Sequence, residues 1–172
     1  MKSVMFFFLL FLTISMSAQN LIKDNVAETK NIQDTLVIKK WLSKVIIDYL
    51  NSKDLKTDFD KMRTALTDSY YNYKQNAINL EYGDELTEAE FQKKWNGIYD
   101  TKLVGKGGFF ISAQDHGNID IQDCKLIKTL SDNAQIYHVV IRDLRWKTNF
   151  ERDIKIVFKQ NRPLIDDIKE YE

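Results

Sequence analysis

The sequence is poor in residues that cross-link a chain or ligate metals. It has 172 residues but only one cysteine and two histidines. The single cysteine, Cys124, excludes an intrachain disulfide, and the apolar Leu126 and Ile127 beside it indicate a thiol that packs as a small hydrophobic side chain. The segment Asp115-His116-Gly117-Asn118 lacks the paired ligands of zinc sites and the alternating oxygens of calcium loops. We expect a hairpin turn there, with Gly117 at positive φ, and neither a metal ion nor a cofactor.

Neither sign of charge is in excess. Basic and acidic residues both number 25, so the formal net charge is zero. No basic run occurs, which argues against a nucleic-acid partner, because such binding depends on clustered Lys and Arg. The segment Gly105-Lys106-Gly107-Gly108 is rich in glycine, but no Ser or Thr follows its lysine and a strand pattern follows in place of a helix. We therefore expect a turn and not a phosphate site.

Long apolar runs are confined to the start of the chain. Lys2 brings one positive charge, residues 4–12 are apolar, and small residues lead to Ala18. This order is typical of an export signal, and the run is shorter than the roughly 20 residues of a membrane-spanning helix. We expect a signal peptide over residues 1–18, a flexible polar segment over 19–33 and one α+β domain over 34–172. No cysteine lies at the end of the signal, so we expect a soluble periplasmic or secreted protein without a lipid anchor.

Helical patterns fill the first half of the domain. Apolar residues from Ile38 to Leu50 recur at spacings of three and four, which predicts an amphipathic helix. A second helix is expected to begin at Asp58, and the segment Thr67-Asp68-Ser69 is expected to break it and to cap a third. Thr87-Glu88-Ala89-Glu90 has the pattern of a capping box, so a fourth helix is expected to start there and to stop at Gly97.

The second half has the alternating pattern of strands. We expect a short strand over residues 109–111 and four longer ones over 119–130, 134–144, 150–159 and 164–171. The short turns between the longer strands require antiparallel neighbours, because a parallel crossover takes a dozen or more residues. The pattern predicts that Ile154, Ile156 and Phe158 of one strand face the helices. It also predicts that Trp41 and Leu42 of the first helix are buried opposite the sheet.

Two strands change phase, around Gln122-Asp123 and around Asp166-Asp167. An extra residue that keeps apolar side chains on one face forms a β-bulge, and bulges bend strands. We therefore expect N-terminal helices packed on the concave side of a curved antiparallel sheet. Both Asp166 and Asp167 are expected to turn to solvent at their bulge, which does not make them a catalytic pair.

Helices followed by a curved meander that ends in Pro163-Leu164-Ile165-Asp166-Asp167-Ile168 resemble the nuclear-transport-factor-2-like (cystatin-like α+β) superfamily. More narrowly, the chain resembles the small exported bacterial members of uncharacterised function, and the segment from Gly108 to Asp115 is a second, weaker point of similarity. The resemblance implies a cone-shaped sheet. It does not imply one activity, since the superfamily includes lyases, isomerases, ligand-binding domains and interaction modules.

His138 is the candidate catalytic residue, because it is a titratable group in the otherwise apolar stretch from Ile136 to Ile141. If it faces the concave side, it lines the cavity in which, as the resemblance implies, related enzymes hold an acid–base pair. Asp143, Asp166 or Asp167 would then orient the imidazole. The alternative is a hydrogen-bonded histidine at the sheet surface.

Aromatic residues gather in the helical half, where Tyr70 and Tyr73 are candidate ligand-binding residues together with His138. Core packing is the alternative for these rings. The patterns favour an exported, non-enzymatic binding domain for a small apolar ligand or a protein partner, without membrane insertion of the mature chain. A cofactor-independent acid–base enzyme that uses His138 is one alternative, and a periplasmic immunity-type protein that blocks a toxin is another. The sequence leaves open a homodimer and the identity of the ligand or partner.

Overall fold

The computed structural model describes residues 35–52, 55–80, 86–105, 108–111 and 115–171. The predicted signal peptide and the segment 19–33 lie outside these residues. The chain divides into two compact units, Met1–Ile38 and Lys39–Glu172, and the description below concerns the second. Across the described ranges, no helix is both long enough and apolar enough to span a bilayer.

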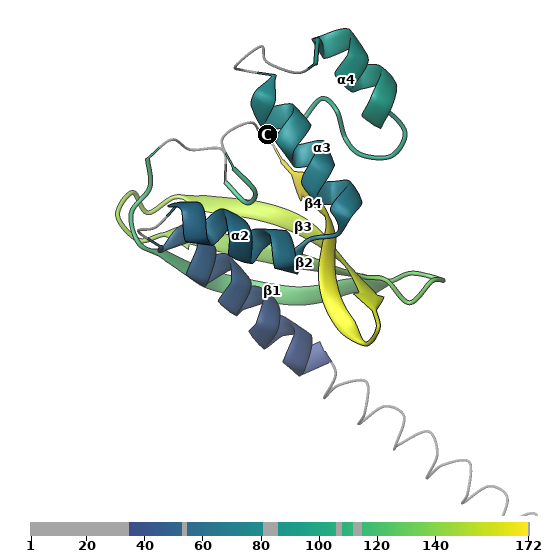
Figure 1. Ribbon diagram of the computed structural model, residues 1–172. Helices are drawn as coiled ribbons and strands as arrows, with labels where there is room; N and C mark the ends of the chain where they lie inside the picture. The colour runs from purple at the N-terminus through teal and green to yellow at the C-terminus, as the bar shows by residue number, and fades with distance from the viewer. Residues whose placement is uncertain (1–34, 53–54, 81–85, 106–107, 112–114, 172) are drawn as a thin grey trace, which may run out of the picture. The chain divides into compact units, whose positions relative to one another are not determined.

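Four helices precede the sheet in the described part of the chain. The first is helical over residues 35–50 and is followed by α2 (Leu55–Ala65), α3 (Asp68–Asn79) and α4 (Glu88–Trp95) (Figure 1). Leu42 and Ile46 of the first helix are fully buried, which confirms its apolar stripe. The prediction that α2 begins at Asp58 is wrong, because the helix already includes Leu55.

The predicted caps of α3 and α4 are confirmed. The Thr67 hydroxyl accepts from the backbone N–H of Tyr70 at 3.2 Å. The Thr87 backbone N–H donates to Glu90 Oε2 at 2.9 Å, and the Glu90 backbone N–H donates to the Thr87 hydroxyl at 3.3 Å. Gly97 follows α4 with a φ of 83°, the left-handed conformation expected after a helix end.

The sheet consists of β1 (Ile119–Thr129), β2 (Gln135–Asp143), β3 (Asn149–Lys159) and β4 (Arg162–Glu170). The strands lie in sequence order and all pair antiparallel, which confirms the α+β class with helices packed against an antiparallel sheet. α2 and α3 contact β4, and α4 contacts α3 (Figure 1).

Both predicted bulges are present. The β1–β2 register shifts between Ile121 and Asp123, so the extra residue is Gln122. In the β3–β4 pair, Lys155 lies opposite Asp167 while Ile156 lies opposite Ile165, so the extra residue is Asp166. A third shift, between Leu126 and Lys128 in β1, was not predicted.

Two local expectations are wrong. Residues 109–111 are buried but join no strand, because the carbonyl of Phe110 accepts from Nε of Arg152 at 2.7 Å and not from a neighbouring strand. Residues 115–118 form no hairpin turn, since no strand lies before them in the described chain. Gly117 is required there by close packing and not by a positive φ: a Cβ would lie 2.2 Å from Cβ of Arg145.

The faces of the sheet are as predicted for Ile154 and Ile156, which are fully buried. Phe158 is not buried with them, so the prediction for this side chain is wrong. It is 42% exposed because it pairs with Pro163 beside the β3–β4 turn, at the end of the sheet. Trp41 is only half-buried, unlike Leu42, because it borders the groove described below.

Candidate functional site

His138 lies on the face of the sheet opposite the helices. Its β2 neighbours Tyr137 and Val139 are buried, and the His138 side chain is 29% exposed. Its Nδ1 lies 2.9 Å from Oδ1 of Asp153, the residue directly opposite on β3. The Tyr171 hydroxyl donates to the other carboxylate oxygen of Asp153. The histidine is therefore oriented by Asp153, a residue that the sequence analysis did not single out.

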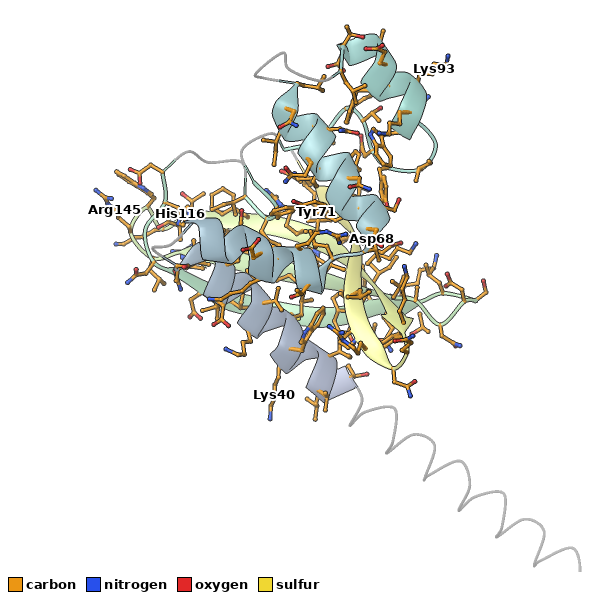
Figure 2. All side chains as sticks on the ribbon, viewed as in Figure 1. Lys40, Asp68, Tyr71, Lys93, His116 and Arg145 are labelled. Carbon is orange, nitrogen blue, oxygen red and sulfur yellow. The ribbon has the colours of Figure 1, made fainter. Side chains whose placement is uncertain are left out.

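The structure does not bring Asp143 to His138. Asp143 is buried and accepts from the backbone N–H groups of Gly117, Arg145 and Trp146 at 2.9, 2.7 and 2.9 Å. Burial opposes ionisation of this carboxyl, but the three backbone donors hold its pKa below the usual value. Asp143 thus connects the β2–β3 turn to the segment before β1. Arg145 of this turn and His116 of this segment lie close together (Figure 2).

Asp166 is also used by the fold. It accepts from the Thr67 hydroxyl and from Nζ of Lys155, both at 2.9 Å. The Thr67 backbone N–H donates to the carbonyl of Ile165 at 2.9 Å. The expectation that Asp166 turns to solvent is wrong, because the bulge aims its carboxylate at the start of α3.

Tyr70 and Tyr73 are buried in an aromatic cluster and do not line the groove described below. The ring centroid of Tyr73 lies 4.6 Å from that of Tyr99 and 5.7 Å from that of Trp95. The Tyr73 hydroxyl donates to the carbonyl of Asp100. Burial raises the pKa of Tyr70 well above its usual value, so this hydroxyl stays protonated. These contacts hold α4 and its following loop against α3.

Asp167, beside this cluster, is expected to make stability depend on pH. Burial, with the negative charge of Asp166, raises its pKa from 3.8 to about 6. The pKa of Asp167 is higher in the folded state than in the unfolded state. Its contribution to stability is therefore complete below the unfolded-state pKa and is lost as the pH rises through the folded-state pKa. Asp167→Asn should therefore stabilise the protein by about 2 kcal/mol at pH 7.5 and by almost nothing at pH 4. Urea unfolding of both proteins at the two pH values measures this, and the exposed Asp60→Asn serves as the matched control. Equal stabilities at pH 7.5 would contradict the assigned environment.

A buried charged cluster, Lys74, Arg152 and Glu170, joins α3 to β3 and β4. Glu170 accepts from Nη2 of Arg152 at 3.2 Å and from Nζ of Lys74 at 3.4 Å. It also accepts from the backbone N–H of Gly105 at 2.9 Å, and Lys74 donates to the carbonyl of the same glycine. The cluster anchors the irregular chain before β1 to the sheet. Its charges are engaged in these contacts, which assigns it a structural role.

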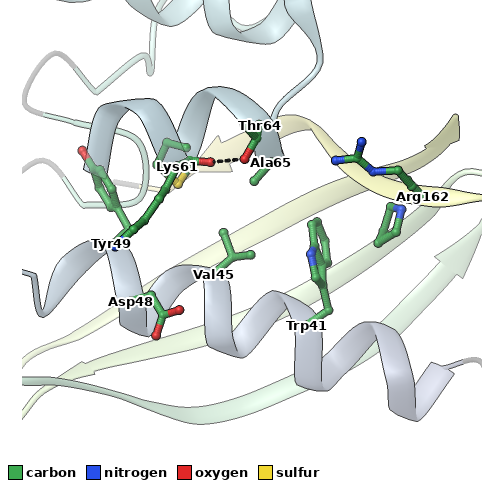
Figure 3. A pocket seen from close by; sticks show the side chains of 10 residues that line it. Trp41, Val45, Asp48, Tyr49, Lys61, Thr64, Ala65 and Arg162 are labelled. Atoms are coloured by element: carbon green, nitrogen blue, oxygen red, sulfur yellow. Dashed lines mark hydrogen bonds between the residues drawn. The ribbon is translucent and has the colours of Figure 1, made fainter. Parts of the chain in front are cut away.

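An open groove lies between the first helix, α2 and the start of β4 (Figure 3). Its volume is about 270 Å³, just below the range of about 300–1,000 Å³ that holds drug-sized ligands. The first helix and α2 each contribute four of the lining residues, and Trp41 reaches from the first helix toward the strand that carries Arg162. The lining residues are Trp41, Val45, Asp48, Tyr49, Lys61, Met62, Thr64, Ala65, Arg162 and Pro163.

The groove is lined by apolar side chains and by the charged side chains of Asp48, Lys61 and Arg162. Asp48 is already paired with Lys44 at 2.7 Å. The Arg162 guanidinium has neither a hydrogen bond nor an ion pair with any described residue, and the indole N–H of Trp41 has no hydrogen bond with one. Tyr49 packs edge-to-face on Phe109, with ring centroids 5.7 Å apart. The arrangement suits an apolar molecule with one polar or anionic group.

The other candidate chemistry finds little support in the described ranges. No group of three or more His, Cys, Asp or Glu side chains is placed to hold a metal ion within them. Cys124 is partly buried, and burial raises the pKa of its thiol to about 11. The thiol is therefore protonated near neutral pH, when only a thiolate would be a good nucleophile.

No family model, no curated protein and no solved structure matches this chain. The site is therefore argued from its own geometry.

Proposed function

We propose that the chain is a non-enzymatic binding domain that takes a small, largely apolar ligand in the groove. The observation that carries the proposal is the wall formed by Trp41, which is half-buried and leaves its indole N–H without a partner among the described residues. Tryptophan joins a large apolar surface to one hydrogen-bond donor, which makes it a frequent anchor for bound molecules.

The other candidate residues make contacts that stabilise the fold, which supports binding over catalysis. The carboxylate oxygens of Asp143 and Asp166 accept hydrogen bonds from backbone and side-chain donors. Tyr70 and Tyr73 are buried against other rings. None of these four residues, and not His138, lines the groove.

We further infer that the chain is exported and that its architecture is similar to the nuclear-transport-factor-2-like cone. The charged start, apolar run and small residues over 1–18 support export. The bulges at Gln122 and Asp166 support a curved sheet, because each adds a residue to one strand only.

The second candidate function is an acid–base enzyme, favoured by one observation. His138 and Asp153 form a carboxylate–imidazole pair, which fixes the orientation and the tautomer of the ring. The pair lies on the sheet face opposite the helices. A substrate would have to bind across β2 and β3, and not in the groove.

Binding of N-phenyl-1-naphthylamine, a neutral apolar dye, tests the proposal. We expect fluorescence enhancement by the purified chain and at least about a tenfold loss of affinity in Trp41→Ala, since truncation of an aromatic anchor often costs 2 kcal/mol or more. Trp146→Ala is the matched control, because Trp146 is 57% exposed and does not line the groove. His138→Ala should bind the dye as the natural chain does. Binding that is lost in His138→Ala but kept in Trp41→Ala would favour the enzyme alternative.

A further inference from the structure

The charged side chains around the groove are unequally neutralised. Asp48, the acidic residue of the lining, is held by Lys44 at 2.7 Å on the same helix. The basic residues of the lining are Lys61 and Arg162. Asp48 is therefore already paired, whereas Arg162 is a basic residue of the lining with no side-chain partner among the described residues.

Arg162 is the cation best placed to act on a ligand. It is the first residue of β4 and lies opposite Lys159 across the β3–β4 turn. No described residue pairs with its guanidinium, although arginine is a planar donor that binds carboxylates with two parallel hydrogen bonds. In Figure 3 the guanidinium stands over the groove, on the side to which the Trp41 ring points.

We propose that the ligand of the groove is a small amphipathic acid, such as a medium-chain carboxylate. Its carboxylate pairs with Arg162, and its apolar body lies along Trp41, Val45 and Met62. The inference rests on the proposed function, because it names the chemistry of the ligand at the same site. A cationic ligand is disfavoured, since Arg162 would repel it while Asp48 is already paired.

A matched pair of dyes isolates the contribution of the anionic group. The dye 1-anilinonaphthalene-8-sulfonate has the skeleton of N-phenyl-1-naphthylamine with one added sulfonate. We expect the natural chain to bind the sulfonate about five- to tenfold more tightly than the neutral dye, the size of a charge-assisted contact at a partly exposed site. Arg162→Gln should abolish this preference, measured as the ratio of the affinities of the same variant for the two dyes.

Two controls test whether the preference for the sulfonate depends on Arg162 and on the anionic group. Lys159→Gln removes a neighbouring exposed charge that does not line the groove, and it should keep the preference for the sulfonate. Decanoate should displace the bound dye from the natural chain at a lower concentration than decanol does. Far-UV circular dichroism checks that each variant is folded.

The outcomes separate this inference from the proposed function. Equal affinities for the two dyes, both lowered by Trp41→Ala, would leave the groove as the site and overturn the anionic ligand. Binding of neither dye would overturn both. A preference for the sulfonate that survives in Arg162→Gln would also overturn the assignment of Arg162.

Discussion

Glu170→Gln is expected to lower the free energy of unfolding by about 3–5 kcal/mol, the usual cost of removing one partner of a buried ion pair. The Glu170 side chain is 10% exposed and accepts from Arg152, Lys74 and the backbone of Gly105. Glutamine has almost the same shape but no charge, so two buried cations would lose their only carboxylate partner in the cluster. Urea unfolding followed by circular dichroism measures the change.

A second substitution makes this prediction specific. Burial already lowers the pKa of Lys74, and Glu170 acts against that effect. In the Glu170→Gln background, Lys74→Met should therefore recover part of the lost stability, because it removes one of the two unpaired charges. A Glu170→Gln chain within 1 kcal/mol of the natural one (about a fivefold change in the folding equilibrium) would refute the assigned role of the cluster.

Ile156→Ala is expected to cost about 2–5 kcal/mol, as other cavity-forming substitutions in protein cores do. Ile156 is fully buried on β3, opposite Ile165 of β4. Alanine leaves the surrounding side chains without contacts that they cannot fully replace by moving. The urea midpoint of the variant measures the loss.

Phe158→Ala is the matched comparison on the same strand. Phe158 is the larger side chain but is 42% exposed, so its truncation should cost less than half as much as that of Ile156. Equal losses at the two positions would mean that the helices cover the end of the sheet, contrary to the structure.

Features set by neighbouring residues could be predicted from the sequence. The caps at Thr67 and Thr87 depend on side chains within three residues, and the bulge at Asp166 follows from the spacing of Ile165 and Ile168. The alternation of apolar residues likewise predicted the strands and most of their buried face, and the short turns predicted their antiparallel pairing. These signals are local, which is why the pattern carries them.

Features that depend on distant residues could not be predicted in this way. The burial of residues 109–111 without a strand depends on Arg152, a side chain of β3. The partner of His138 depends on strand register across the β2–β3 turn, and a small error in turn length exchanges one aspartate for another. The groove escaped notice for the same reason, because three separate elements build it. Trp41 was expected in the core, and only its half-burial marks it as a wall of that groove.

The most direct test of the groove as the binding site is a titration of the ¹⁵N-labelled chain with N-phenyl-1-naphthylamine, followed by NMR amide shifts. The account predicts that the largest shift changes fall on Trp41, Val45, Met62 and Arg162, on the walls of the groove. The amides of His138 and Asp153, on the opposite face of the sheet, should stay in place. Changes centred on His138 and Asp153, with the groove unaffected, would contradict the account.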